Sequence, residues 1–184
     1  MINGVSARTG RDAIAIEPLD AQVDHVRGSA AGRLILEYGD YECPYSRRAY
    51  REIQRVEHQL GGAVRFAFRH FPLMRIHPHA ATAAAAAEAA AVQGRFWEMH
   101  DLLYHRQRAL EDEDLLRYAG EIGLDVERFD RDRATDSVLR RVARDMSSGI
   151  ESGQVRGTPT LFIDGVLHDG AYDAATLVAA LSER

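Results

Sequence analysis

Residues 33–60 read RLILEYGDYECPYSRRAYREIQRVEHQL, and this stretch decides the fold class. Its opening run, Arg33–Tyr38, is apolar apart from one acid and its leading Arg, which is typical of a buried strand. A Gly and an Asp then break the run. Pro44 suits the first turn of a helix, and apolar side chains recur at helical spacing until two glycines follow Leu60. The stretch therefore predicts a strand, a turn, and a helix from Pro44 to about Leu60.

The chain after this helix changes from strand to a long helical block. Residues 63–71 alternate large apolar side chains with Arg65, Ala67 and Arg69, which predicts a strand with one buried face. From about residue 77 to residue 152 the pattern is wholly helical. Part of this block, at residues 80–92, is almost entirely alanine, the best helix former, whose small side chain allows close packing.

Strand patterns return near the C-terminus. Thr160–Ile163 and Val166–His168 flank Asp164-Gly165, which is a strong hairpin signal. A last helix fits after Asp173, its expected N-cap. The whole order is strand–helix–strand, helical block, strand–strand–helix. It predicts an α/β core with an inserted helical subdomain.

The composition fits a single folded domain. The chain has 184 residues, 46% of them hydrophobic, which is enough to bury a core. All 23 basic residues are Arg, and the net charge of −5 argues against general nucleic-acid binding. We expect residues 1–23 to form an N-terminal tail with a short strand at 14–16. Residues 24–184 are expected to form the domain, with the insertion at about 77–152.

Two features of the sequence bear on location. No stretch has 18 consecutive apolar residues, so no membrane-spanning helix is expected. Residues 1–20 lack an apolar core of signal-peptide length. The sequence as given therefore predicts a cytoplasmic protein without a membrane partner.

Cys43 is the only cysteine, which excludes an intrachain disulfide and a cysteine-based zinc cage. It stands immediately before Pro44, at the start of the predicted helix. Unpaired backbone N–H groups and the positive end of the helix dipole favour the thiolate there, and the thiolate is the reactive form. The alternative is a buried, inert cysteine.

A second feature shifts the balance towards a reactive site. Gly157-Thr158-Pro159-Thr160 stands immediately before a predicted strand, a position that tolerates proline. Bonds preceding proline are where cis peptides occur, although the trans form is much the commoner. The strand–Cys-Pro–helix unit upstream is what favours a cis bond before Pro159.

Several short motifs occur along the chain in an order and at a spacing that are typical of one protein family. They lie at residues 24–28, 36–45, 68–73, 77–80, 94–100, 157–160 and 170–172. On these motifs the chain resembles the DsbA-like branch of the thioredoxin superfamily, from about Asp24 to the C-terminus. The likeness is to soluble bacterial DsbA-like oxidoreductases and to the DsbA-like domain fused to some sodium/proton antiporters.

The resemblance implies a thioredoxin-like fold with a helical subdomain between its βαβ and ββα halves. It implies that Cys43 is the nucleophile and that Pro159 is the cis-proline beside it. Thr158 would offer its backbone to an extended substrate by strand addition. Pro44 and Tyr45 are expected to contact the substrate with them.

Glu37, six residues before Cys43, matches the buried acid of DsbA-type proteins. Such an acid mediates proton transfer at the sulfur. The alternative is a strand-end carboxylate paired with an Arg, without a catalytic role.

The sequence departs from the family pattern at Ser46. The usual motif is Cys-x-x-Cys, and its second thiol resolves the mixed disulfide formed by the first. Ser46 cannot do this, but its hydroxyl lies one helical turn from Cys43 and can donate a hydrogen bond to the thiolate. The sequence therefore predicts a monothiol thiol–disulfide oxidoreductase. Cys43 would attack a protein or small-molecule disulfide, and an external low-molecular-weight thiol such as glutathione would release it.

Two other functions stay open. Kappa-class glutathione transferases and related isomerases share the fold and use a thiol cofactor, but they carry Ser where this chain has Cys43. A non-catalytic peptide-binding module would depend on exposed aromatic residues such as Tyr41 and Tyr45 rather than on Cys43.

The remaining polar clusters favour structural roles. His77-Pro78-His79 invites a metal site, but two His around a Pro rarely converge without further ligands, so we expect a helix-entry turn and no metal. Arg47 and Arg48 fit a solvated helix face, and the alternative is that they steer an acidic thiol towards Cys43. No tightly bound cofactor is expected.

Overall fold

The computed structural model describes residues 16–20 and 22–183. Residues 14 and 15 of the strand predicted in the tail lie outside this range, while Ile16 is buried against the sheet without belonging to a strand. No helix in the described part of the chain is both long and apolar enough to cross a bilayer.

A mixed sheet forms the centre of the described chain, with five strands in the order β1-β3-β2-β4-β5. β2 and β3 are parallel, and the other neighbouring pairs are antiparallel. The strands are β1 (His25–Gly28), β2 (Arg33–Gly39), β3 (Val64–His70), β4 (Thr160–Ile163) and β5 (Val166–Leu167).

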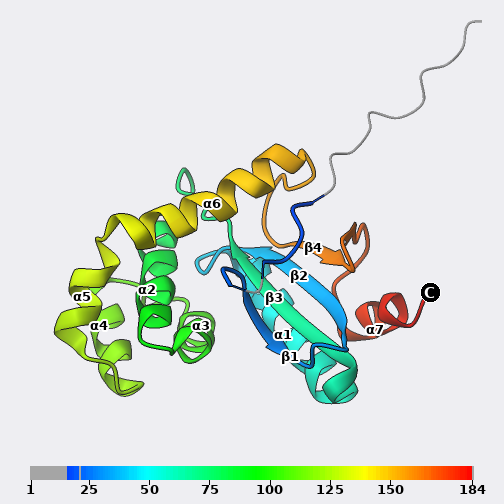
Figure 1. The fold of residues 1–184 in the computed structure, drawn as a ribbon, viewed down its shortest axis with the longest axis horizontal. Helices are drawn as coiled ribbons and strands as arrows, with labels where there is room; N and C mark the ends of the chain where they lie inside the picture. Colours follow the sequence, from blue (N-terminus) through cyan, green and yellow to red (C-terminus); the bar gives the residue numbers. More distant parts are fainter. Residues whose placement is uncertain (1–15, 21, 184) are drawn as a thin grey trace, which may run out of the picture.

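Helices cover both faces of this sheet. α1 (Pro44–Leu60) connects β2 to β3 and packs beside α7 (Ala174–Ser182) on one face. α2 (Ala80–Val92), α3 (Phe96–His105), α4 (Asp112–Glu121) and α5 (Val126–Arg133) form a group beside the sheet, and α6 (Asp136–Ser152) runs from that group back across it (Figure 1). The predicted α/β core with helices inserted between β3 and β4 is confirmed.

Local sequence explains most element boundaries. The predicted helix from Pro44 to Leu60 is confirmed, and its buried face carries Ala49, Tyr50, Ile53 and Val56. Asp173 caps α7 by accepting a hydrogen bond from the Thr176 N–H, as predicted. α2 is buried nearly all round, which its alanines permit because they leave room for α3, α5 and α6.

The prediction that β3 has one buried face is wrong, because both of its faces are buried. Arg69 has no exposed surface, and its Nε and Nη2 bind the two carboxylate oxygens of Asp24 at 3.0 and 2.8 Å. Tyr38 Oη and the carbonyls of Glu17 and Pro18 accept its other hydrogen bonds. A buried charge is tolerated here because every donor has a partner.

The sequence places Arg140, Arg141 and Arg144 on one predicted helix, which favours a solvated helix face, but the structure does not bear this out for all three. Arg141 and Arg144 of α6 turn towards the sheet and pair with Asp24 and Asp145. Their ion pairs attach the inserted helices to the core, a role that helical periodicity alone does not reveal.

Replacing Arg69 by Ala should lower the free energy of unfolding by about 3–5 kcal/mol, because it leaves the Asp24 carboxylate buried without its main partner. Urea unfolding followed by circular dichroism would measure this. Arg140→Ala is the matched control, since its partner Asp136 is 87% exposed and such pairs contribute little. Equal losses in the two variants would contradict the argument.

Candidate active site

Cys43 occupies the N-cap of α1 and is 3% exposed. Its Sγ donates a hydrogen bond to the Thr158 carbonyl oxygen at 3.3 Å. Its own carbonyl accepts hydrogen bonds from the Arg47 N–H and from the Gln107 side chain. The thiol therefore lies at the positive end of a 17-residue helix, in a fixed backbone frame.

The sheet register brings the two halves of the site together. β2 and β4 are antiparallel, with Tyr38 opposite Thr160, so the end of β2 lies beside the start of β4. Cys43 follows β2 and Pro159 precedes β4. The Thr158–Pro159 peptide bond is cis. A groove of about 370 Å³ extends from this bond and is lined by residues 156–161 and 167–170 with Gln154 and Tyr172.

Ser46 is fully buried on the first turn of α1, where its Oγ accepts a hydrogen bond from the Asp40 N–H at 3.3 Å. The Cys43 sulfur bonds instead to the Thr158 carbonyl. The role of the Ser46 hydroxyl towards the thiolate stays a prediction. Pro44 and Tyr45 lie at the surface beside Cys43, and Tyr45 is 64% exposed. The expectation that Tyr41 is exposed is wrong, because its ring is buried against Phe68 and Tyr104.

Glu37 is fully buried on β2, between Phe68 of β3 and Leu161 of β4. Neither carboxylate oxygen accepts a hydrogen bond from the described residues. Burial raises its pKa to about 8, and the positive charge of Arg27 opposes the shift only partly. The alternative is that Glu37 is a strand-end carboxylate paired with an Arg. No Arg in the described structure donates a hydrogen bond to it.

Gly39 makes room for this carboxyl. A Cβ at Gly39 would lie 2.3 Å from the Phe68 ring, 2.8 Å from Tyr104 Oη and 2.9 Å from Glu37 Oε1. Tyr104 is fully buried, and burial together with Glu37 raises its pKa. Sequence reasoning missed Tyr104, because it comes from the inserted helix α3 and only the fold carries it to β2.

The side chains of Arg47 and Arg48, at the start of α1, have different partners. Arg47 donates to the His105 carbonyl at 3.2 Å, whereas the exposed Arg48 lies 5.9 Å from the Tyr172 ring centre. A hollow of about 780 Å³ lies around Leu34 and Leu36, on the face of the sheet away from α1. None of the predicted site residues lines it.

The histidines of the 77–79 turn do not converge on one point. His77 Nδ1 pairs with Asp40, and His79 Nδ1 pairs with Glu42. Both acids belong to the loop that carries Cys43. Sequence reasoning had treated this turn as a junction with the insertion and did not connect it with Cys43.

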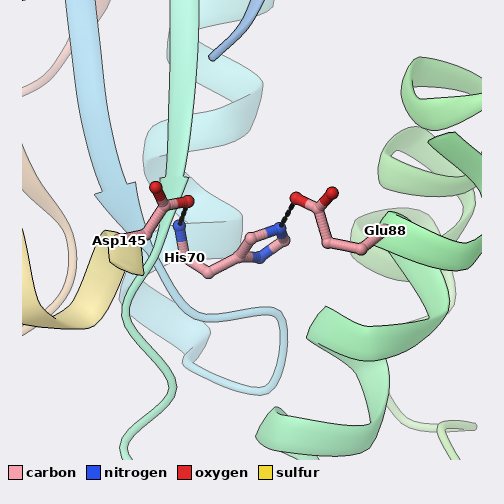
Figure 2. A group of neighbouring side chains, drawn as sticks. All are labelled: His70, Glu88 and Asp145. Carbon is pink, nitrogen blue, oxygen red and sulfur yellow. Dashed lines mark hydrogen bonds and ion pairs between the residues drawn. The ribbon is translucent and has the colours of Figure 1, made fainter. Parts of the chain in front are cut away.

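Another group, His70, Glu88 and Asp145, has potential ligand atoms within 4.8 Å of one another in the described structure. Figure 2 shows Glu88 at the His70 ring, 2.8 Å from Nε2, and Asp145 at the His70 backbone N–H. Arg141 pairs with Asp145 and lies 3.9 Å from Glu88. These contacts give both carboxylates partners within the protein and join α2 and α6 to β3.

A cysteine at a helix start beside a cis-proline that immediately precedes a neighbouring strand is the arrangement expected of the thioredoxin-fold class. The family model described as the DSBA-like thioredoxin domain matches residues 34–182. The chain belongs to this family, whose members generally catalyse thiol–disulfide exchange.

Individual relatives agree with this assignment. A thioredoxin-like oxidoreductase from Silicibacter pomeroyi superposes with a TM-score of 0.77 at 30% identity, covering 94% of this chain and 96% of that one. BdbD from Bacillus subtilis, at 19% identity, has the same fold with a TM-score of 0.77, covering 93% of this chain and 97% of that one.

The curated relatives include much longer proteins. A protein named Na(+)/H(+) antiporter NhaA 1, from Mycolicibacterium vanbaalenii, is 46% identical over 169 residues, which is 90% of this chain and 27% of that protein. The chain thus spans about a quarter of that relative's length.

Glu37→Gln should abolish one component of the pH dependence of stability. The folded state holds a proton on Glu37 up to a pKa of about 8, whereas the unfolded chain loses it near the ordinary value of 4.5. The free energy of unfolding should therefore fall as pH rises through this window, by up to about 1.4 kcal/mol per pH unit. The glutamine variant should lack this slope and be more stable than the wild type at pH 8.

Urea unfolding at pH 5, 6, 7 and 8 measures the slope directly. Exposed Glu151→Gln serves as the control and should keep the wild-type pH dependence. If Glu37→Gln and Glu151→Gln gave the same slope, Glu37 would not be the buried group that holds a proton in the folded state.

Proposed function

We propose that the protein is a thiol–disulfide oxidoreductase that works by a monothiol mechanism with Cys43 as its nucleophile. The observation that carries the proposal is the Cys43 Sγ at the start of α1, 3.3 Å from the carbonyl that precedes the cis-proline Pro159. Cys43 is the only cysteine of the chain, so it has no second thiol to resolve it.

The reaction takes place in two exchanges. The Cys43 thiolate attacks one sulfur of a disulfide, forms a mixed disulfide, and expels the other sulfur as a thiolate. An external low-molecular-weight thiol then gives up its proton and attacks the substrate sulfur of the mixed disulfide. It leaves with that sulfur as a new disulfide, and Cys43 is released as thiolate. No net oxidation of the protein occurs.

Glu37 would carry the proton between the two exchanges: protonated near neutral pH, it would donate to the thiolate expelled in the first exchange and take the proton back from the external thiol in the second. A carboxyl with a pKa of about 8 takes up and gives back a proton near neutral pH, and nothing in the described structure engages either of its oxygens. It lies on the face of β2 that packs against α1. Its proton exchange with the sulfur is part of the proposal.

The substrate would lie in the groove beside Pro159. Thr158 is half-buried, and its carbonyl oxygen accepts the hydrogen bond of the Cys43 thiol. With substrate bound, this oxygen would accept a hydrogen bond from an extended peptide or from the amide of a small thiol. Pro44 and the exposed Tyr45 would contact the same ligand. A cytoplasmic location stays a prediction of the sequence.

Glutathione exchange at Cys43 tests the nucleophile. Intact mass after adding oxidised glutathione should show one adduct, formed within minutes near pH 7, and reduced glutathione should remove it. Cys43→Ser should form none and should lose all exchange activity. A wild-type chain that stays unmodified, yet still binds peptides as well as Cys43→Ser does, would support the non-catalytic alternative.

Restoring the second thiol tests the role of the fourth motif position. Ser46→Cys should gain an internal disulfide with Cys43 and the ability to oxidise dithiols, because the resolving thiol is again one helical turn away. Oxidation of a dithiol peptide, followed by fluorescence, would measure this. Ser46→Ala is the matched control and should not gain it; a Ser46→Cys chain without dithiol oxidation would mean that the site lacks an intact dithiol scaffold.

A further inference from the structure

Asp40 is the centre of the loop that joins β2 to Cys43. It is 1% exposed, and its carboxylate accepts three hydrogen bonds, each 2.8 Å long, from the N–H groups of Glu42 and Leu73 and from His77 Nδ1. Its backbone carbonyl accepts from the Cys43 N–H at 3.1 Å. Asp40 thus ties Cys43 to the segment that enters the inserted helices.

The charge of this carboxylate matters because few of the other groups around Cys43 carry a charge that could offset it. The ionisable groups around Cys43 from the other elements are Glu37 on β2, Tyr104 on α3, Tyr172 before α7, and Arg47 and Arg48 on α1. Tyr41, Glu42 and the exposed Tyr45 flank it on its own segment, and Glu42 pairs with His79.

Most of these neighbours are neutral or turned away. Burial raises the pKa values of Glu37, Tyr104 and Tyr172, which keeps them uncharged near neutral pH. Arg47 binds the His105 carbonyl and Arg48 lies at the Tyr172 ring. A negative charge near Cys43 disfavours its thiolate, and a positive partner on that charge relieves the effect.

His77 is the side chain that can supply this positive charge when its ring is protonated. Its side chain is 15% exposed and lies 2.8 Å from Asp40, which is itself inaccessible to solvent. A second pair, His79 with Glu42, joins the same two segments at 3.0 Å, but there the side chains are 34% and 20% exposed and His79 also meets the exposed Glu111. Solvent screens that second pair more strongly.

We propose that Asp40 and His77 are a positioning pair for Cys43: their hydrogen bond fixes the Cys43 loop, and the protonated His77 ring offsets the Asp40 carboxylate so that the thiolate forms. The inference rests on the proposed function in taking Cys43 as the reacting group. It adds residues that never touch the substrate and that act through the loop.

The test is the pH profile of Cys43 alkylation by iodoacetamide in the full chain, where no other thiol competes. His77→Asn keeps an amide donor near Nδ1 but cannot carry charge. Its half-maximal rate should move to higher pH by about half a unit, which slows alkylation at pH 7 about threefold. Asp40→Asn, which removes the negative charge, should move the profile to lower pH.

His79→Asn is the matched control and should shift the profile less than His77→Asn does, because solvent screens its pair with Glu42 more strongly. A His77→Asn profile equal to that of the wild type would overturn the proposal, as would an equal shift in His79→Asn. If Asp40→Asn fails to fold by circular dichroism, the two histidine variants still decide. Alkylation requires no disulfide turnover, so a chain that follows these profiles without glutathione exchange would sink the proposed function and leave the pair intact.

Discussion

The antiparallel pairing of β2 with β4 is the constraint on which the site depends. It joins strands more than 120 residues apart in sequence and places the end of one beside the start of the other. The Cys43 sulfur consequently meets the Thr158 carbonyl at 3.3 Å. Neither partner is special locally: a cysteine at a helix start and a proline before a strand become one site only through this register.

The inserted helices are joined to the core through charge as well as apolar packing. Asp24 with Arg69, and Glu88 with His25 and His70, bury acids and bases in pairs at the boundary between the sheet and the helical group. Buried pairs of this kind fix a geometry more than they add stability, because desolvation cancels much of their attraction. A defined boundary matters here, since the insertion supplies Tyr104 beside Glu37 and its entry turn supplies His77 beside Asp40.

The sequence predicted the elements well where short-range rules apply. Pro44 at a helix start, Asp164-Gly165 at a hairpin and Asp173 at an N-cap act within a few residues, and all three are found. The prediction failed for β3, where alternation suggested a solvent face. The alternating pattern predicts that the Arg69 side chain faces solvent. Its burial is explained only by Asp24, which lies on the neighbouring segment and binds it.

The sequence by itself determined the α/β order, the single thiol at a helix start and the missing resolving cysteine, because these depend on residue identity and local spacing. The tertiary structure decided which groups surround that thiol. Glu37 has a pKa of about 8 only because the sheet and helices exclude water and leave its oxygens without partners. Asp40 and His77 are 37 residues apart in sequence. They meet only because the chain, after leaving β3, passes the loop that carries Cys43. Desolvation and charge pairing are properties of the packed chain, and no linear pattern encodes them.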